Sequence, residues 1–98
     1  MARTAILICY DISDTRRWRE VFETCKAFGD HMQYSVFTAR LTDMAYAELV
    51  TMLSDAINAR EDRVLIVRLG PDGKDLAKRV KTLGRQEKPF GREDDMIF

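Results

Sequence analysis

The stretch Ala5-Ile-Leu-Ile-Cys-Tyr-Asp11 constrains the fold more than any other part of the chain. Five consecutive apolar residues lead to Tyr10, and the run stops at Asp11. A strand with one solvent-exposed face alternates polar and apolar side chains. An uninterrupted apolar run therefore indicates a strand that is buried on both faces. We therefore predict a central strand that delivers Asp11 to the edge of a sheet, where a charge needs a partner, a hydrogen bond or a metal.

The length and composition indicate one small globular domain. The chain has 98 residues, of which 46% are hydrophobic and 33% charged, as is usual for a soluble protein. We expect a folded domain over residues 1–84 and a C-terminal tail over residues 85–98. No apolar run approaches the roughly 18 residues that span a bilayer, and the N-terminus lacks a signal-peptide pattern. We therefore expect a cytoplasmic protein with no membrane partner.

Charge is balanced over the whole chain but unevenly placed. The formal net charge is zero, yet residues 60–92 hold ten Lys and Arg against five acids, and Arg16, Arg17 and Arg19 follow Asp11. This pattern argues against indiscriminate polyanion binding and is compatible with a local basic surface. The two cysteines, Cys9 and Cys25, are too far apart for a metal knuckle or a redox pair, so we interpret both as small core residues.

Two amphipathic helices are predicted from apolar residues at helical spacing. Ser13 or Asp14 caps the first helix and Gly29 ends it, while Thr42 or Asp43 caps the second. The first stripe is Trp18, Val21, Phe22, Cys25 and Phe28, and the second is Tyr46, Leu49, Val50, Leu53 and Ile57.

The remaining segments are read as strands, a short helix and a tail. Residues 31–41 are either one bent strand or, as we favour, a short strand to about Tyr34 and a longer one from Ser35. Residues 63–69 form another strand that is apolar on nearly both faces, and residues 76–83 suggest a short third helix. The apolar end, residues 96–98, is predicted to add as a strand to a sheet edge, with a disordered tail as the alternative.

The element order β-α-β-β-α-β predicts an α+β, ferredoxin-like fold, in which an antiparallel sheet carries two helices on one face. The first and last of these strands are apolar on both faces, so the face without helices also needs a cover. In a chain of this length the simplest cover is a second copy. We therefore predict a homodimer that packs face to face about a two-fold axis.

Two short motifs resemble a known protein family. The sequences Tyr10-Asp-Ile-Ser13 and Gln33-Tyr-Ser-Val-Phe37, with the arginines that follow the first motif, resemble CRISPR-associated protein two, the small dimeric subunit of the spacer-acquisition machinery. The resemblance covers residues 4–70. It implies a ferredoxin-like homodimer that is either a metal-dependent endonuclease for single-stranded RNA or double-stranded DNA, or a non-catalytic DNA-binding adaptor for an integrase subunit.

The resemblance also implies which residues act. The family's metal-binding catalytic aspartate corresponds to Asp11, and its neighbouring aromatic to Tyr10. Its nucleic-acid-binding residues correspond to Arg16, Arg17, Ser35 and Phe37.

Strand alternation gives this site a physical basis, because Leu7, Cys9 and Asp11 share one strand face. If the dimer buries that face, two copies of Asp11 approach each other and their repulsion is relieved by a shared proton or cation. Mg²⁺, which binds through one or two carboxylates and several waters, suits such a shared site. A less specific explanation of Asp11 is an Asx turn or helix cap, and Tyr34 and Phe37 are more often packing residues than surfaces for stacking bases.

Overall fold

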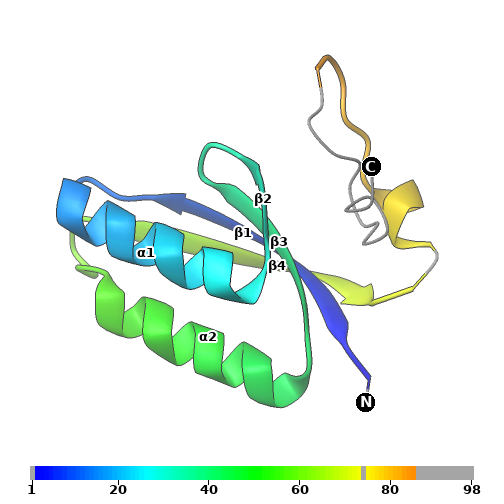
Figure 1. Ribbon diagram of the computed structural model, residues 1–98, viewed down its shortest axis with the longest axis horizontal. Helices are drawn as coiled ribbons and strands as arrows, with labels where there is room; N and C mark the ends of the chain where they lie inside the picture. Colours follow the sequence, from blue (N-terminus) through cyan, green and yellow to red (C-terminus); the bar gives the residue numbers. More distant parts are fainter. Residues whose placement is uncertain (1, 74, 86–98) are drawn as a thin grey trace.

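The chain folds into one antiparallel sheet with two helices, as a computed structural model describes for residues 2–73 and 75–85 (Figure 1). The elements, in order, are β1 (Thr4–Asp11), α1 (Thr15–Phe28), β2 (Asp30–Gln33), β3 (Val36–Leu41), α2 (Asp43–Ala56), β4 (Arg63–Pro71) and the short 3₁₀ helix η1 (Leu76–Arg79).

The sheet has the order β2-β3-β1-β4, and every neighbouring pair is antiparallel. Both helices cover the same face of this sheet (Figure 1). The ferredoxin-like fold predicted from the element order is therefore confirmed, including the division of residues 31–41 into two strands.

Each helix begins and ends for a local reason. The side chain of Asp14 accepts a hydrogen bond from the Arg17 N–H, and that of Thr42 accepts one from Ala45 N–H, so these two residues are the caps. Gly29 ends α1 in an extended conformation, with φ −155°. A Cβ there would lie 2.0 Å from the carbonyl oxygen of Thr38, so glycine is required by the close approach of β3.

The main core lies between the sheet and the helices. Alternate residues of β1 (Ile6, Ile8 and Tyr10) point into it, together with Phe37 of β3 and the buried residues of both helices. The buried helix residues include Val21 and Cys25 from α1 and Leu49 and Leu53 from α2. These positions confirm the central part of both predicted stripes, whereas Trp18 lies at the rim with 37% of its surface exposed.

The other face of the sheet has two unlike ends. At the end near the start of β1, Leu76 of η1 packs on Ala5, with Leu7, Leu69 and Val80 around them, and we name this the covered end. At the end where β1 stops, β1 and β4 present Cys9, Leu65, Val67, Asp11 and Arg63, and we name this the open end. Leu65 and Val67 are 54% and 38% exposed there.

Further predictions from the sequence can be compared with the structure. The predicted third helix is a single 3₁₀ turn over Leu76–Arg79. Cys25 is a core residue as predicted, but Cys9 is only half-buried on the open end. The predicted strand over residues 96–98 and most of the predicted tail lie outside the described residues. In the described part of the chain, no helix has the length and apolar character needed to cross a membrane.

Candidate functional site

Asp11 is the last residue of β1, and its carboxylate is exposed on the open end. Its position follows from alternation: Ile8 and Tyr10 point toward the helices, so Cys9 and Asp11 point to the opposite face. Within residues 2–73 and 75–85, the Asp11 carboxylate has no hydrogen-bond or ion-pair partner within the usual distances. The side chain is therefore available to a cation or a ligand.

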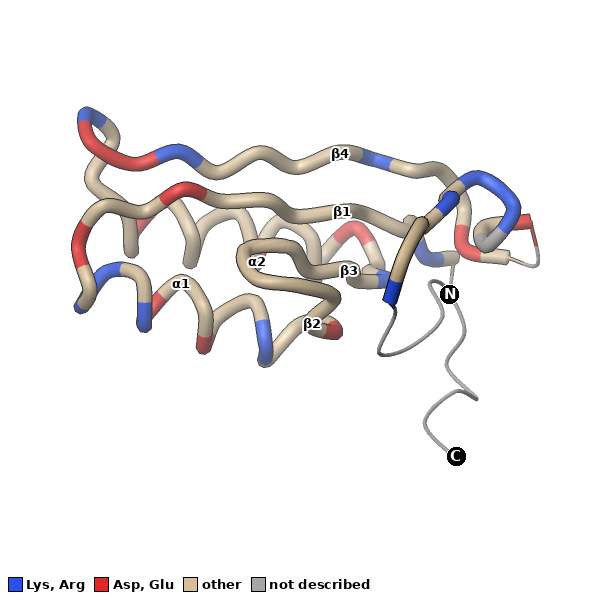
Figure 2. The backbone as a smooth tube through the Cα atoms, turned by 90° about the horizontal axis from the view of Figure 1, so that it is seen from above, with Lys and Arg blue, Asp and Glu red and all other residues tan. Residues whose placement is uncertain are grey.

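Arg63 is the cross-strand neighbour of Asp11. The two residues are Cα partners in the β1–β4 ladder and lie on the same face of the sheet. Figure 2 shows acidic and basic residues close together where β1 ends and β4 begins. Arg63 was not among the residues that the sequence motifs indicated, because its place opposite Asp11 depends on the register of two strands about fifty residues apart in the chain.

Arg17 is part of a dense set of hydrogen bonds rather than a free cation. Its Nε donates to Asp62 Oδ2 at 2.7 Å, and its Nη2 donates to Glu61 Oε1 at 2.9 Å. The Asp62 side chain is fully buried and also accepts from the backbone N–H groups of Ser13 (3.2 Å) and Asn58 (2.8 Å). We call these residues the Arg17–Asp62 cluster.

The cluster connects the loop after Asp11 to the loop before Arg63, so it fixes both sides of the open end. The hydrogen bond from Arg17 lowers the pKa of the Asp62 carboxyl below its usual range, although burial opposes this effect. The same hydrogen bond raises the pKa of the Arg17 guanidinium. Phosphate binding by Arg17 stays a prediction, and a phosphate there would compete with two carboxylates.

Two of the residues implied by the resemblance point into the core. Phe37 is fully buried, and Tyr10 stacks on it with ring centroids 6.2 Å apart. The Tyr10 hydroxyl is buried and has no hydrogen-bond partner among the described residues. Burial, reinforced by Cys25, raises the pKa of Tyr10 to about 12. As the structure describes them, both rings lie on the opposite side of the sheet from Asp11, and their predicted catalytic and binding roles remain untested.

Ser35 and Arg16 lie nearer to Asp11. The carbonyl oxygen of Ser35 accepts a hydrogen bond from the Tyr10 N–H at 3.1 Å, which places the β2–β3 turn beside the end of β1. Arg16 is exposed in the first turn of α1 and is free of ion pairs in the described part of the protein. Of the predicted nucleic-acid-binding residues, Arg16 is therefore the cation most accessible to a phosphate.

The donor set of the open end suits Mg²⁺ only if further ligands join Asp11. The described residues contain no group of three or more His, Cys, Asp or Glu side chains that could hold a metal. Mg²⁺ binds in proteins through as few as one or two carboxylates and keeps several waters. The exposed, unpaired carboxylate of Asp11 fits this chemistry as one ligand, and a second copy of the chain would supply the other.

Comparison with known proteins shows which family this sequence belongs to. Residues 4–80 match the family model described as CRISPR associated protein Cas2. CRISPR-associated endoribonuclease Cas2 1 of Rhodospirillum rubrum is 36% identical over 98% of this chain and 93% of its own length. CRISPR-associated endoribonuclease Cas2 of Geobacter sulfurreducens is 34% identical over 89% of this chain and 90% of its own length.

Solved structures show the same architecture. The crystal structure of Streptococcus pyogenes Cas2 superposes with a TM-score of 0.71, is 28% identical, and covers 82% of this chain and 99% of its own. A hypothetical protein of Thermus thermophilus, TT1823, shares the fold with a TM-score of 0.76, at 23% identity over 89% of this chain and 98% of its own. The matched residues include β1 with Asp11, both helices and β4, and the chain belongs to the CRISPR-associated protein Cas2 family.

Proposed function

We propose that the protein is a divalent-metal-dependent endoribonuclease of the CRISPR system, active as a homodimer and taking part in spacer acquisition and in defence against foreign nucleic acid. The observation that carries the proposal is the Asp11 carboxylate, which is exposed and unpaired at the end of a central strand. Support comes from the relatives in Rhodospirillum rubrum and Geobacter sulfurreducens, both of which are named endoribonucleases.

The dimer follows from the apolar surface around Asp11. Leu65 and Val67 are exposed on the same face as Cys9 and the half-buried Val36. A contiguous apolar surface on a sheet is stabilised when a partner removes it from water. A second copy that packs this face about a two-fold axis brings the two Asp11 side chains toward each other, so that each protomer contributes one carboxylate to the site.

In such a dimer the two Asp11 carboxylates would hold one Mg²⁺ or a similar cation. The cation would offset phosphate charge and make water a better nucleophile toward a phosphodiester. Arg63, beside Asp11 in the sheet, and the exposed Arg16 bind the phosphates of the substrate. Phosphate contacts of this kind depend little on base sequence and weaken steeply as salt rises.

The test is cleavage of a labelled single-stranded RNA by purified protein, with Mg²⁺ or Mn²⁺ and with a chelator. We expect Asp11→Asn to lower kcat by at least about 100-fold, in the range found when one electrostatic group of an active site is removed. Asp55→Asn is the matched control, since Asp55 is an exposed carboxylate on α2, which covers the opposite face of the sheet from Asp11. Its cleavage rate should equal that of the wild type.

Cleavage that survives Asp11→Asn, or that does not require a divalent cation, would contradict this proposal. If neither the wild type nor Asp11→Asn cleaves RNA, but both bind double-stranded DNA and an integrase subunit, the chain is instead a non-catalytic adaptor of the spacer-integration complex.

A further inference from the structure

Tyr34, in the turn between β2 and β3, combines two features that folding alone does not favour. Its backbone has φ +31°, and it is the only non-glycine residue with positive φ in the described part of the chain. Its side chain is 92% exposed. Glycine or asparagine adopts this backbone conformation at lower cost, and a large aromatic ring in water stabilises nothing within the protomer. Strained, exposed residues of this kind are typical of functional sites.

The backbone of the turn that carries Tyr34 is anchored to the core through His31. The His31 Nε2 lies 2.7 Å from the carbonyl oxygen of Tyr34, as in a hydrogen bond donated by the ring. The His31 ring packs on Phe37, with centroids 4.8 Å apart, and meets Phe22 edge-on at 5.3 Å. Because Phe37 is fully buried in the core, the backbone of the turn is anchored, and the Tyr34 ring projects from a fixed support.

This support stands beside Asp11. In the β1–β3 ladder Cys9 pairs with Val36, and the next hydrogen bond runs from Tyr10 N–H to the Ser35 carbonyl. Ser35 therefore lies beside the end of β1, and Tyr34 is its neighbour in the two-residue turn between Gln33 and Val36. Figure 1 shows the β2–β3 turn on the side of the sheet away from both helices. Alternation along β1 directs the Asp11 side chain to that same side.

We propose that Tyr34 stacks on an unpaired nucleobase of a single-stranded RNA whose phosphate lies at the open end of the sheet. This inference rests on the proposed function and adds to it one residue, Tyr34, that contacts a base rather than a phosphate. An aromatic ring stacks on any base, but only where the base is not already stacked inside a duplex. One ring on a rigid turn beside a phosphate-binding end therefore favours single strands and leaves duplexes unaffected.

The test separates the ring from the backbone strain. Tyr34→Gly removes the ring and relieves the positive φ, whereas Tyr34→Phe keeps the ring. Binding of a fluorescent single-stranded RNA is measured by anisotropy in a chelator, so that cleavage does not interfere. We expect Tyr34→Gly to have a higher Tm than the wild type but a Kd raised about 10-fold, within the effect of losing one base–aromatic stack. Tyr34→Phe should bind within about twofold of the wild type.

Two controls complete the design. A duplex of the same length should bind wild type and Tyr34→Gly equally. Met44→Ala removes another highly exposed apolar side chain, at the start of α2, and should leave the Kd for RNA unchanged.

Wild-type affinity of Tyr34→Gly for single-stranded RNA would overturn the inference while leaving the proposed function intact. So would a loss of affinity that simply follows a weaker dimer in sedimentation, since Tyr34 would then contact the second copy. If the wild type binds no RNA at all, the proposed function fails, and this inference fails with it.

Discussion

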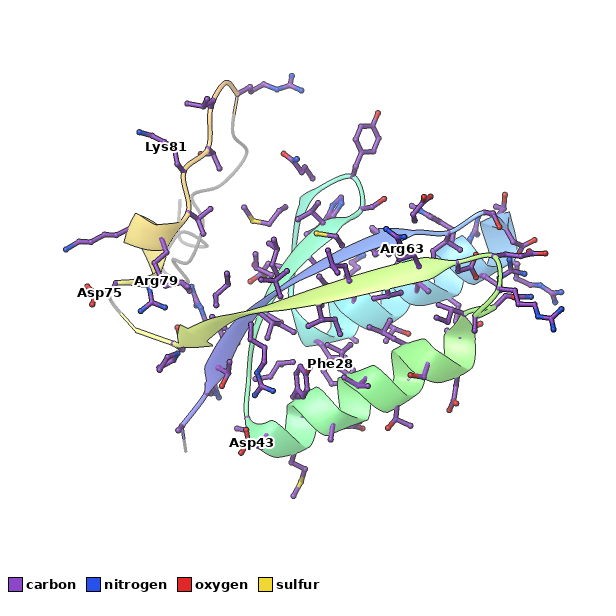
Figure 3. All side chains as sticks on the ribbon, turned by 180° about the vertical axis from the view of Figure 1, so that it is seen from behind. Phe28, Asp43, Arg63, Asp75, Arg79 and Lys81 are labelled. Carbon is purple, nitrogen blue, oxygen red and sulfur yellow. The ribbon has the colours of Figure 1, made fainter. Side chains whose placement is uncertain are left out.

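The sheet face that carries no helices has a covered end and an open end. These two ends differ in whether their side chains have partners within the protomer. At the covered end, Leu76 packs on Ala5, Arg79 donates to the Leu69 carbonyl, and Arg40 forms an ion pair with Asp72 at 3.3 Å. Figure 3 shows Arg79 and Asp75 at this end and Arg63 at the other. At the open end, Leu65 and Val67 are exposed and the carboxylate of Asp11 has no partner in the described part of the chain.

The difference assigns separate roles to the two ends. A chain segment that covers apolar residues and pairs charges within one protomer contributes to that protomer's stability. Apolar and charged side chains that stay unsatisfied side by side indicate a surface completed by something else. We therefore assign stability to the covered end, and we propose the open end as the place of dimer formation, metal binding and RNA cleavage.

Leu65→Asp is expected to give the largest effect. It places a carboxylate in the proposed interface, and a charge buried there without a partner costs roughly 2–5 kcal/mol. The dissociation constant of the dimer should rise by more than about 30-fold as a result, and cleavage should be lost with the dimer. Sedimentation across a concentration series measures the first effect. Met52→Asp, at a comparably exposed apolar residue on α2, is the control and should change neither quantity. A dimer that persists in Leu65→Asp would place the interface elsewhere.

Leu76→Ala should weaken the packing at the covered end and leave dimer formation at the open end unchanged. Leu76 is 3% exposed, so truncating it should lower the free energy of unfolding by about 2–4 kcal/mol. Dimer affinity should be unchanged at temperatures where both proteins are folded. Leu83→Ala, at an exposed leucine of the same segment, should leave stability unchanged and serves as the control. If Leu76→Ala dissociates the dimer instead, the two ends do not have separate roles.

Asp62→Asn is a smaller perturbation, and it tests the Arg17–Asp62 cluster. Cleavage should fall about 10-fold, as when a supporting residue of a metal site is removed. The matched control is Asp72→Asn, which breaks the ion pair to Arg40 at the covered end and should leave cleavage unchanged. Equal cleavage by both variants would show that the cluster does not position Asp11.

The same variant makes a prediction for pH. Because folding lowers the pKa of Asp62, its contribution to stability is present above the usual carboxyl pKa of about 4 and is lost as pH falls further. The Tm of the wild type should therefore exceed that of Asp62→Asn at pH 7, and the difference should shrink as pH falls below about 4. A Tm difference that stays constant down to pH 2 would contradict the assigned pKa shift.

Much of the fold follows from local sequence patterns. Apolar runs identified β1 and β4, and helical spacing identified the stripes of α1 and α2, because each pattern reports burial by neighbours within the same element. Alternation along β1 also placed Tyr10 and Asp11 on opposite faces. A homodimer through the open end is still a prediction that rests on the same patterns.

Local sequence patterns could not predict the interactions that shape the site. The sequence around Arg17 is typical of a solvated helix residue, and only the folded chain brings Asp62 to it from 45 positions away. The same holds for Arg63 opposite Asp11, since sheet register is a tertiary property. Tyr34 was interpreted as a packing residue, and no signal in the sequence marks its positive φ or its exposure.

The central claim is that the open end is completed by a second protomer and holds one cation between two Asp11 carboxylates. A calorimetric titration of Mn²⁺ into the wild-type protein, which measures how many ions bind per chain, tests this claim most directly. We predict one ion per two chains, with binding lost in Asp11→Asn and in the dissociated Leu65→Asp variant. One ion per chain, or unchanged Mn²⁺ binding by Asp11→Asn, would contradict the shared site.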